Sequence, residues 1–323
     1  MSSYLLRRIA SAAVLVVLVV SLTFFVLHAA PGSPADYLLV GPSAGQAEAR
    51  QRLERALGLD RPVAEQYLAW VAGAVRGDLG TSYSSGRPVS RILGEALPNT
   101  LLLAFAAVVV EYTIALPLGI WAARRRGRTA DQVLRAGSLV LYSLPVFWMG
   151  LMAILLLTLR WPIFPAGHMV SPGAQDLPPA DRLADLGWHL VLPATVLGLA
   201  MAGGTMRFVR GSLGEVLDQD YIRTARAKGL SEGRVVVVHG LRNALAPILQ
   251  LLGVSLPALL NGSLIVEVVF SWPGVGRLAY QAIYARDFPV ILGATTLSAV
   301  LVVAGSLLAD LLHAAADPRL RDV

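Results

Sequence analysis

The sequence predicts an all-helical integral membrane protein with six transmembrane helices and both termini in the cytoplasm. Of its 323 residues, 55% are hydrophobic and 15% are charged, whereas soluble domains carry about 25% charged residues. The apolar residues gather in blocks of about 20, the length that an α-helix needs to cross about 30 Å of hydrocarbon. Backbone polar groups in lipid must be paired internally, so helices are the expected spanning elements.

Six apolar blocks define the predicted spans. They cover residues 9–29, 98–123, 136–159, 188–208, 244–268 and 290–314. The first block follows Arg7 and Arg8, as a signal peptide would, but the apolar region of a signal peptide usually has 7–15 residues. The run from Ile9 to Ala30 is longer, and Pro31 is unfavourable beside a cleavage site. A retained membrane anchor is therefore expected.

The distribution of basic residues predicts the orientation. The N-terminus, the connections 124–135 and 207–242, and the C-terminus together hold 16 Arg and Lys residues and seven acidic ones. The opposite side holds 11 of each kind. Short basic connections are cytoplasmic in membrane proteins. Membrane topology and anionic headgroups thus explain the formal net charge of +6, and no nucleic-acid partner is expected.

Three regions are expected along the chain. Residues 1–97 comprise the first helix and a long extracytoplasmic loop, residues 98–315 a five-helix core, and residues 316–323 a short cytoplasmic tail. The connection 160–187 is rich in Pro, Gly and Asp and shows no assignable pattern.

Two helices are predicted within the long loop. The first is the charged segment Gln46–Leu57, which Gly58 ends, and the second runs from Pro62 to about Val75. Pro is favoured in the first turn of a helix. Apolar residues of the second segment fall on one face, as in helices that lie in the membrane interface. Packing against a neighbouring span is the open alternative.

The connection 207–242 carries the most informative pattern. Tyr221–Lys228 is rich in helix formers and is followed by Gly229, and Ser231 can cap a second short helix. A short helix held out from the membrane, with Tyr, Leu and several cations, suits docking into a groove on a soluble partner. The alternative is a solvated basic loop that only sets the topology.

This connection resembles the coupling loop of ATP-binding-cassette importer permeases of the dipeptide, oligopeptide and nickel family. Aligned on Gly229, the Glu-Ala-Ala of the wider family falls on Arg223, Thr224 and Ala225, and the replaced residues are typical of the peptide and nickel branch. Further segments resemble the family in the same order along the chain: Leu57–Pro62, Arg76–Ser82, Glu267–Gly276, Arg286–Pro289 and Asp317–Arg319.

The resemblance implies the type I importer permease fold and the first of the two permeases of a bacterial inner-membrane dipeptide transport system. The implied partners are a second homologous permease, two cytoplasmic ATPase domains, an extracytoplasmic solute-binding protein, the peptide cargo and the bilayer. The residues implied to couple to the ATPases are Tyr221, Arg223, Thr224, Ala225, Arg226, Ala227, Lys228, Gly229, Leu230, Ser231 and Glu232.

The chain itself is not expected to be an enzyme. A phosphate-binding loop needs Gly-x-x-x-x-Gly-Lys-Ser/Thr, but the single lysine, Lys228, precedes Gly229 and Leu230. ATP and Mg²⁺ are therefore expected on partner subunits, with no cofactor in this chain. The absence of cysteine excludes a thiolate metal site, and no metal ligand set is predicted.

Several residues are candidates for the translocation path or its gate. An ionisable side chain within a span is a functional candidate by default. Glu111 is expected either to face the translocation cavity or to be buried and hydrogen-bonded to a neighbouring helix. The third span combines a kink at Pro145 with aromatic and hydroxyl side chains. These side chains either line a cavity or pack against neighbouring helices. For Glu267 and its neighbours the resemblance implies a gate or binding-protein contact, the alternative being an interfacial anchor. The full candidate set is Glu111, Tyr142, Ser143, Pro145, Phe147, Trp148, Glu267, Phe270, Ser271, Trp272 and Pro273.

Other functions make different demands on the sequence. A permease for nickel complexes or another small solute would share all of these features. A stand-alone secondary transporter predicts inverted repeats and paired charges at mid-membrane, and neither pattern is present. An intramembrane enzyme needs paired catalytic residues at one depth, and none of the five histidines lies in such a motif.

Overall fold

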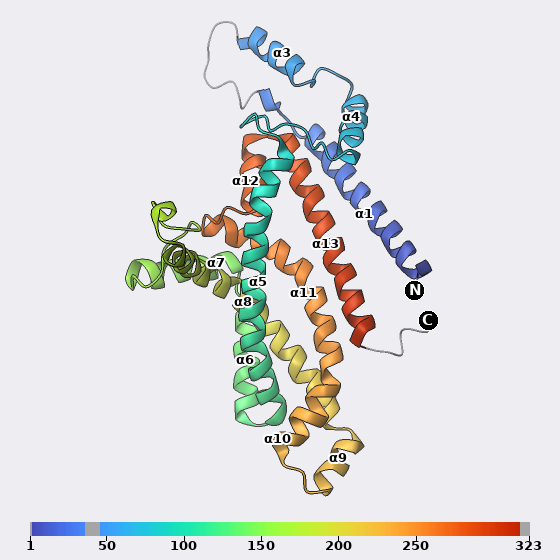
Figure 1. Ribbon diagram of the computed structural model, residues 1–323, viewed down its shortest axis with the longest axis vertical. Coiled ribbons are helices and arrows are strands. Elements are labelled where there is room, and N and C mark those ends of the chain that lie inside the picture. Colours follow the sequence, from blue (N-terminus) through green and yellow to red (C-terminus); the bar gives the residue numbers. More distant parts are fainter. Residues whose placement is uncertain (1, 36–45, 317–323) are drawn as a thin grey trace. The chain divides into compact units, whose positions relative to one another are not determined.

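The computed structural model describes residues 2–35 and 46–316, and helices form nearly all of the regular structure in these ranges (Figure 1). The chain divides into two compact units. One comprises Met1–Thr100 and Pro273–Val303, and the other comprises Leu101–Trp272 and Ala304–Val323. Residues 36–45 of the predicted external loop and residues 317–323 of the predicted tail lie outside the described part.

Within the described part, four helices contain a stretch long and apolar enough to cross a membrane. They are α1 (Ser2–Ala29), α5 (Val89–Arg124), α8 (Pro179–Leu217) and α13 (Phe288–Ala316), and they coincide with the first, second, fourth and sixth predicted spans. α11 (Arg242–Val269) coincides with the fifth predicted span but includes residues whose side chains lie outside the described set. The structure thus contains four candidate spans, or five if the bent pair is counted as one span. The number six remains a prediction.

The third predicted span is broken rather than continuous over 136–159. α6 (Thr129–Ser143) is followed by α7 (Val146–Ile154) and the π-helical η1 (Leu155–Arg160), and the two halves meet at 94°. Proline disfavours helical backbone at the residue before it, and Leu144 is extended, with φ −77° and ψ 131°. The kink expected at Pro145 is therefore a complete interruption of the helix.

The helix that contains the fourth predicted span begins nine residues before that span, just as α5 begins nine residues before the second one. α8 starts at Pro179, inside the connection 160–187 to which no pattern could be assigned. Pro178 caps the helix and Pro179 fits its first turn, where a missing N–H costs nothing. Polar residues in the first two turns, such as Asp181 and Arg182, hide the helix from a hydropathy pattern.

The two predicted loop helices are present in the first unit. α3 (Gln46–Ala56) ends two residues before Gly58, whose φ of +70° is left-handed. α4 (Val63–Val75) begins immediately after Pro62. It contacts α1, because the Tyr67 hydroxyl lies 2.6 Å from Ser21 Oγ, which supports packing on a neighbouring span for this face of the helix.

Asp287 holds the loop of residues 78–88 against the turn between α12 (Val275–Ala285) and α13. Its carboxylate accepts hydrogen bonds from the hydroxyls of Ser82 and Ser84, each at 2.7 Å, and from the backbone N–H groups of Tyr83 and Ser84. Burial and, next, the charge of Asp287 raise the pKa of Tyr83 to about 12. The Tyr83 phenol therefore stays neutral at physiological pH.

Close helix packing organises the second unit. A Cβ added at Gly198 of α8 would lie 2.8 Å from the Ala107 carbonyl oxygen of α5, and one at Gly203 would lie 2.5 Å from the Ser138 carbonyl oxygen of α6. Small residues let helix backbones approach in membrane proteins. α8 can therefore pack closely on both α5 and α6. This packing sets the position of the end of α8, from which the next connection begins.

Candidate functional site

The connection after α8 contains the helix α9 (Asp220–Ala227), and one face of this helix is fixed to the core. Ile222 is fully buried and Ala225 is 6% exposed. Both belong to an apolar cluster with Leu213 and Leu217 of α8 and with Val235. Burying an isoleucine contributes roughly 2 kcal/mol, so α9 is attached to the end of α8 rather than suspended in solvent.

The opposite face of α9 is exposed. Its side chains include Tyr221, Arg223, Thr224, Ala227 and Lys228. The Tyr221 hydroxyl accepts a hydrogen bond from Asn243 Nδ2 at 2.9 Å, which links α9 to the start of α11. This face therefore presents a cationic surface with one aromatic ring, held in place by its buried counterpart.

The predicted coupling segment 221–232 contains a helix, a turn and the start of a second short helix, as the helix formers, Gly229 and Ser231 predicted. α9 ends at Ala227, Gly229 turns the chain with a φ of +77°, and α10 (Glu232–Arg234) follows with Ser231 at its N-cap. Glycine adopts this left-handed backbone without the steric cost of a Cβ. An ion pair between Arg226 and Glu232, at 2.7 Å, closes the turn.

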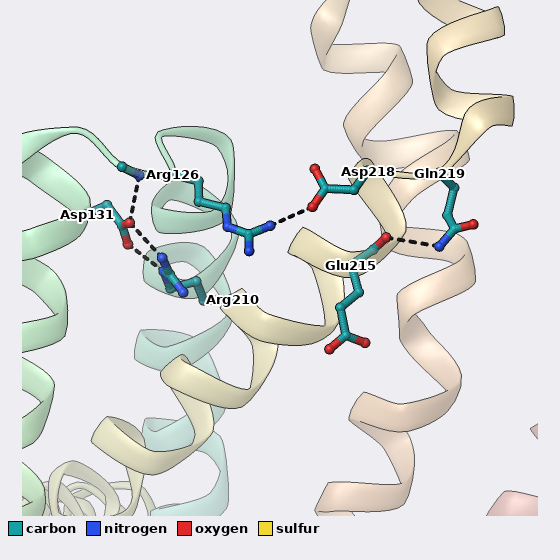
Figure 2. A network of polar contacts seen from close by, with 7 residues as sticks. Arg126, Asp131, Arg210, Glu215, Asp218 and Gln219 are labelled. Carbon is teal, nitrogen blue, oxygen red and sulfur yellow. Dashed lines mark hydrogen bonds and ion pairs between the residues drawn. The ribbon is translucent and has the colours of Figure 1, made fainter.

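A partly buried ion pair joins α8 to the start of α6. Figure 2 shows the Asp131 carboxylate facing the Arg210 guanidinium, whose Nε and Nη2 atoms both donate to it. The Gly127 N–H adds a third hydrogen bond to Asp131 at 3.0 Å. The Asp131 side chain is 1% exposed. Because two parallel hydrogen bonds hold the guanidinium to the carboxylate, the contact fixes the orientation of α6 on α8 near the coupling segment.

A second pair lies nearer the solvent. Arg126 Nη1 is 2.6 Å from Asp218 Oδ2 at the end of α8, and both side chains are more than half exposed (Figure 2). An exposed pair of this kind contributes little to stability. Neither ion pair was predicted from the sequence. The signal that could have indicated the first pair is that Asp131 is the single acidic residue in the Arg-rich connection 124–135.

Glu111 is fully buried within α5 and faces α8, where the Thr205 hydroxyl donates a hydrogen bond to its Oε1 atom. Of the two roles open for Glu111, a helix partner is the one for which the structure shows a contact.

The residues around the helix break are largely exposed. Tyr142 is 61% exposed, Phe147 49% and Trp148 44%. The Arg207 guanidinium lies over the Tyr142 ring, 4.9 Å from its centroid. Ser143 Oγ donates to the Leu139 carbonyl one turn earlier, as a hydroxyl in a helix commonly does. Pro145 caps α7.

The residues at the end of α11 have the opposite environment. Glu267, Phe270 and Trp272 are all at most 1% exposed, so Trp272 is not on the outer surface of the chain, as an interfacial anchor would be. Ser271 adopts a left-handed φ of +53°, and Pro273, in the other unit, is exposed.

The break in the third span and the end of α11 meet inside the second unit. A Cβ on Gly150 of α7 would lie 3.0 Å from Val269 and 3.3 Å from Phe270. The Phe270 carbonyl also accepts a hydrogen bond from the His168 N–H at 2.8 Å. Two of the predicted path segments are thus neighbours in space although more than 100 residues separate them. Within the described residues no group of three or more His, Cys, Asp or Glu side chains is arranged to hold a metal ion.

Comparisons with known proteins cover nearly the whole length of the chain. The family model "Binding-protein-dependent transport system inner membrane component" matches residues 115–322, and the corresponding N-terminal model matches residues 1–104. The oligopeptide transport system permease protein AppB of Bacillus subtilis is 40% identical over 321 residues. The dipeptide transport system permease protein DppB of Escherichia coli K12 is 36% identical over 337 residues. Each alignment covers 99% of both chains.

Solved structures share the fold at lower identity. An inward-facing form of the MetNI methionine ABC transporter matches with a TM-score of 0.57 and 18% identity, covering 70% of this chain and 96% of that one. A crystal structure of an amino acid ABC transporter matches with a TM-score of 0.52. The family expected from the sequence motifs is thereby confirmed: the chain belongs to the inner membrane components of binding-protein-dependent transport systems, the non-catalytic permeases of ABC importers.

Proposed function

We propose that the chain is the first permease subunit of an ATP-driven importer of di- and oligopeptides. The cargo rests on the peptide permeases of Bacillus subtilis and Escherichia coli, which are 36–40% identical over the full length. In this proposal the chain has six spans and cytoplasmic termini. It forms half of the translocation pathway beside a second permease, receives cargo from an extracytoplasmic solute-binding protein, and couples to two ATPase domains that bind ATP and Mg²⁺.

The division of the chain follows the same proposal. Residues 1–97 supply the first span and an extracytoplasmic loop, residues 98–315 supply the permease core with the coupling connection 207–242, and residues 316–323 form a cytoplasmic tail. Exposed Tyr142, Phe147 and Trp148 would line the pathway beside the second permease, whereas the Thr205 contact supports a packing role for Glu111.

The two faces of α9 carry the coupling proposal. The exposed face, with Tyr221, Arg223 and Lys228, supplies the surface for an ATPase. The buried face, with Ile222 and Ala225, transmits the displacement to α8 and η3 (Val235–Leu241). Because Asp131 and Arg210 join α8 to α6, the movement would reach the broken third span. ATP can drive a change between two conformations of the transporter only by binding one conformation more tightly than the other. In this proposal the change is a rigid-body movement of the helices.

Affinity purification of the tagged chain in mild detergent, followed by mass spectrometry, tests this function. We expect wild-type protein to retain a second permease and an ATPase subunit. The exposed-face variant Y221A/R223E should lose the ATPase but keep the second permease, because it leaves the membrane spans unchanged. R182E, which reverses a charge at the exposed start of α8, is the matched control. A chain that moves peptide without ATP, or ATPase retention in Y221A/R223E, would contradict the coupling assignment.

A further inference from the structure

A polar cavity of about 580 Å³ lies beside the coupling segment, within the second unit. Its wall is formed by the end of α5, the turn into α6, the end of α8 and the segment that contains Arg226 and Glu232. Ligand pockets for small molecules typically have 300–1,000 Å³. The cavity is therefore large enough for the polar part of a lipid or a small metabolite.

The wall of the cavity is strongly cationic. It contains five arginines against two carboxylates, a net charge of +3; these residues are Arg124, Arg125, Arg126, Arg128, Arg226, Asp218 and Glu232. The two carboxylates are already paired, Asp218 with Arg126 and Glu232 with Arg226. Within the described part of the chain, Arg124 and Arg128 form no ion pair. Two guanidinium groups are thus available to an anion, and their planar donor pattern suits a phosphate.

One edge of the cavity is apolar and exposed. Trp121 contributes to the wall, is 40% exposed, and carries the Arg125 guanidinium 4.9 Å above its ring. Leu118, one turn earlier on α5, is 37% exposed. Tryptophan is enriched at the boundary between hydrocarbon and headgroups. The exposed face of α5 therefore offers a path for an acyl chain that leads directly to the arginines.

We propose that this cavity binds the headgroup of an acidic phospholipid, with Arg124 and Arg128 as the principal phosphate ligands. Trp121 and Leu118 contact the glycerol and the first part of an acyl chain. Basic pockets of this kind at the cytoplasmic ends of membrane helices bind anionic headgroups. The lipid belongs to the inner leaflet, which rests on the proposed orientation. Since the wall also includes Arg226 and Glu232, the bound headgroup stabilises the turn after α9 and links the lipid to the coupling segment.

Native mass spectrometry of the purified full chain tests the site without ATPases or transport. The probes are dioleoylphosphatidylglycerol, dioleoylphosphatidylcholine and inorganic phosphate. We expect one phosphatidylglycerol molecule to stay bound at detergent concentrations that remove phosphatidylcholine. In R124Q/R128Q its affinity should fall about 25-fold, because each basic residue near an anionic lipid contributes roughly a factor of five.

Matched variants separate a specific site from a general charge effect. R55Q/R76Q removes two exposed arginines from the external loop and should bind phosphatidylglycerol like the wild type. R124K/R128K keeps the charge and the topology signal but loses the bidentate geometry, so it should bind phosphatidylglycerol more weakly than the wild type and more tightly than R124Q/R128Q. If R124Q/R128Q does not accumulate as a monodisperse protein, R128Q alone carries the test, with an expected loss of about fivefold.

Three results would overturn the proposal. The first is equal binding of the two lipids, and the second is unchanged phosphatidylglycerol binding in R124Q/R128Q. The third is occupancy by inorganic phosphate that excludes the lipid, which would assign the cavity to a soluble anion. None of these results bears on whether the chain imports peptides.

Discussion

The Asp131 carboxylate at the start of α6 is held by two hydrogen bonds from the Arg210 guanidinium of α8. A third hydrogen bond, from the Gly127 N–H, ties the same carboxylate to the turn that precedes α6. The connection 124–135, the broken third span and the helix that leads into the coupling segment therefore meet at one buried acidic residue. Any movement of the end of α8 must either carry α6 with it or break this pair.

Substitution of Asp131 by Asn should destabilise the protein by about 2 kcal/mol, because the Arg210 guanidinium, only 19% exposed, loses its charged hydrogen-bond acceptor. The exposed pair supplies a contrast: R126Q should cost less than about 1 kcal/mol. Equilibrium unfolding with SDS in mixed micelles measures both. The double variant D131N/R210Q should cost less than the sum of the two single changes, since the second change removes the uncompensated charge. Additive effects would show that the two side chains do not interact.

The two faces of α9 should respond differently to truncation. I222A removes buried methyl groups from the cluster beneath α9 and should cost about 3 kcal/mol of unfolding free energy. Y221A changes an exposed position and should leave stability within about 0.5 kcal/mol, while reducing ATPase stimulation in the assembled transporter. The pair of measurements is unfolding in mixed micelles and cargo-stimulated ATP hydrolysis. Destabilisation by Y221A equal to that by I222A would contradict the assignment of an inner and an outer face.

Gly203 should be intolerant of even a methyl group. A Cβ at this position would lie 2.5 Å from the Ser138 carbonyl oxygen, so G203A must separate α8 from α6 and should cost about 2 kcal/mol. Gly211 lies on the same helix with no atom within 4 Å of an added Cβ. G211A should therefore be neutral or stabilise the helix by up to about 1 kcal/mol. Thermal unfolding of the two purified variants compares them, and similar midpoints would refute the close approach.

Asp287 should control the stability of the loop of residues 78–88. D287N replaces an acceptor of four hydrogen bonds with an amide whose NH₂ group faces donors, a loss of roughly 2 kcal/mol. Local opening of the loop exposes the Tyr83–Ser84 bond, so chymotrypsin cleavage there should become about 30-fold faster when cleavage follows the open population. S85A is the control, because the Ser85 hydroxyl bonds Ser82 and not Asp287. Equal cleavage rates in D287N and wild type would exclude Asp287 as the anchor.

The positions of most membrane helices followed from the sequence because hydropathy acts locally. The blocks at 9–29, 98–123 and 290–314 lie within α1, α5 and α13, since about 20 apolar residues meet the length requirement by themselves. Gly58 and Gly229 marked the ends of the short helices α3 and α9 for an equally local reason. Both adopt a left-handed φ, which glycine tolerates better than any other residue.

Contacts between residues far apart in the sequence could not be predicted from local sequence patterns. Hydropathy missed the polar first turns of α8 and treated the third span as continuous, because neither a proline break nor a polar helix start changes the mean composition of a long window. The pairing of Asp131 with Arg210, 79 positions away, depends on the packing of α6 against α8. The sequence indicated only that one acid lay among many arginines.

The sequence by itself determined the family and the helical class, and it predicted the segment proposed to meet an ATPase, because these depend on composition, spacing and local turn residues. Tertiary structure decided which residues of that segment are available. It buried Ile222 and Ala225, exposed Tyr221 and Arg223, and brought Arg124 and Arg128 to the wall of one cavity with Arg226. Side-chain exposure is set by which helices pack together, and packing is a property of the folded chain as a whole.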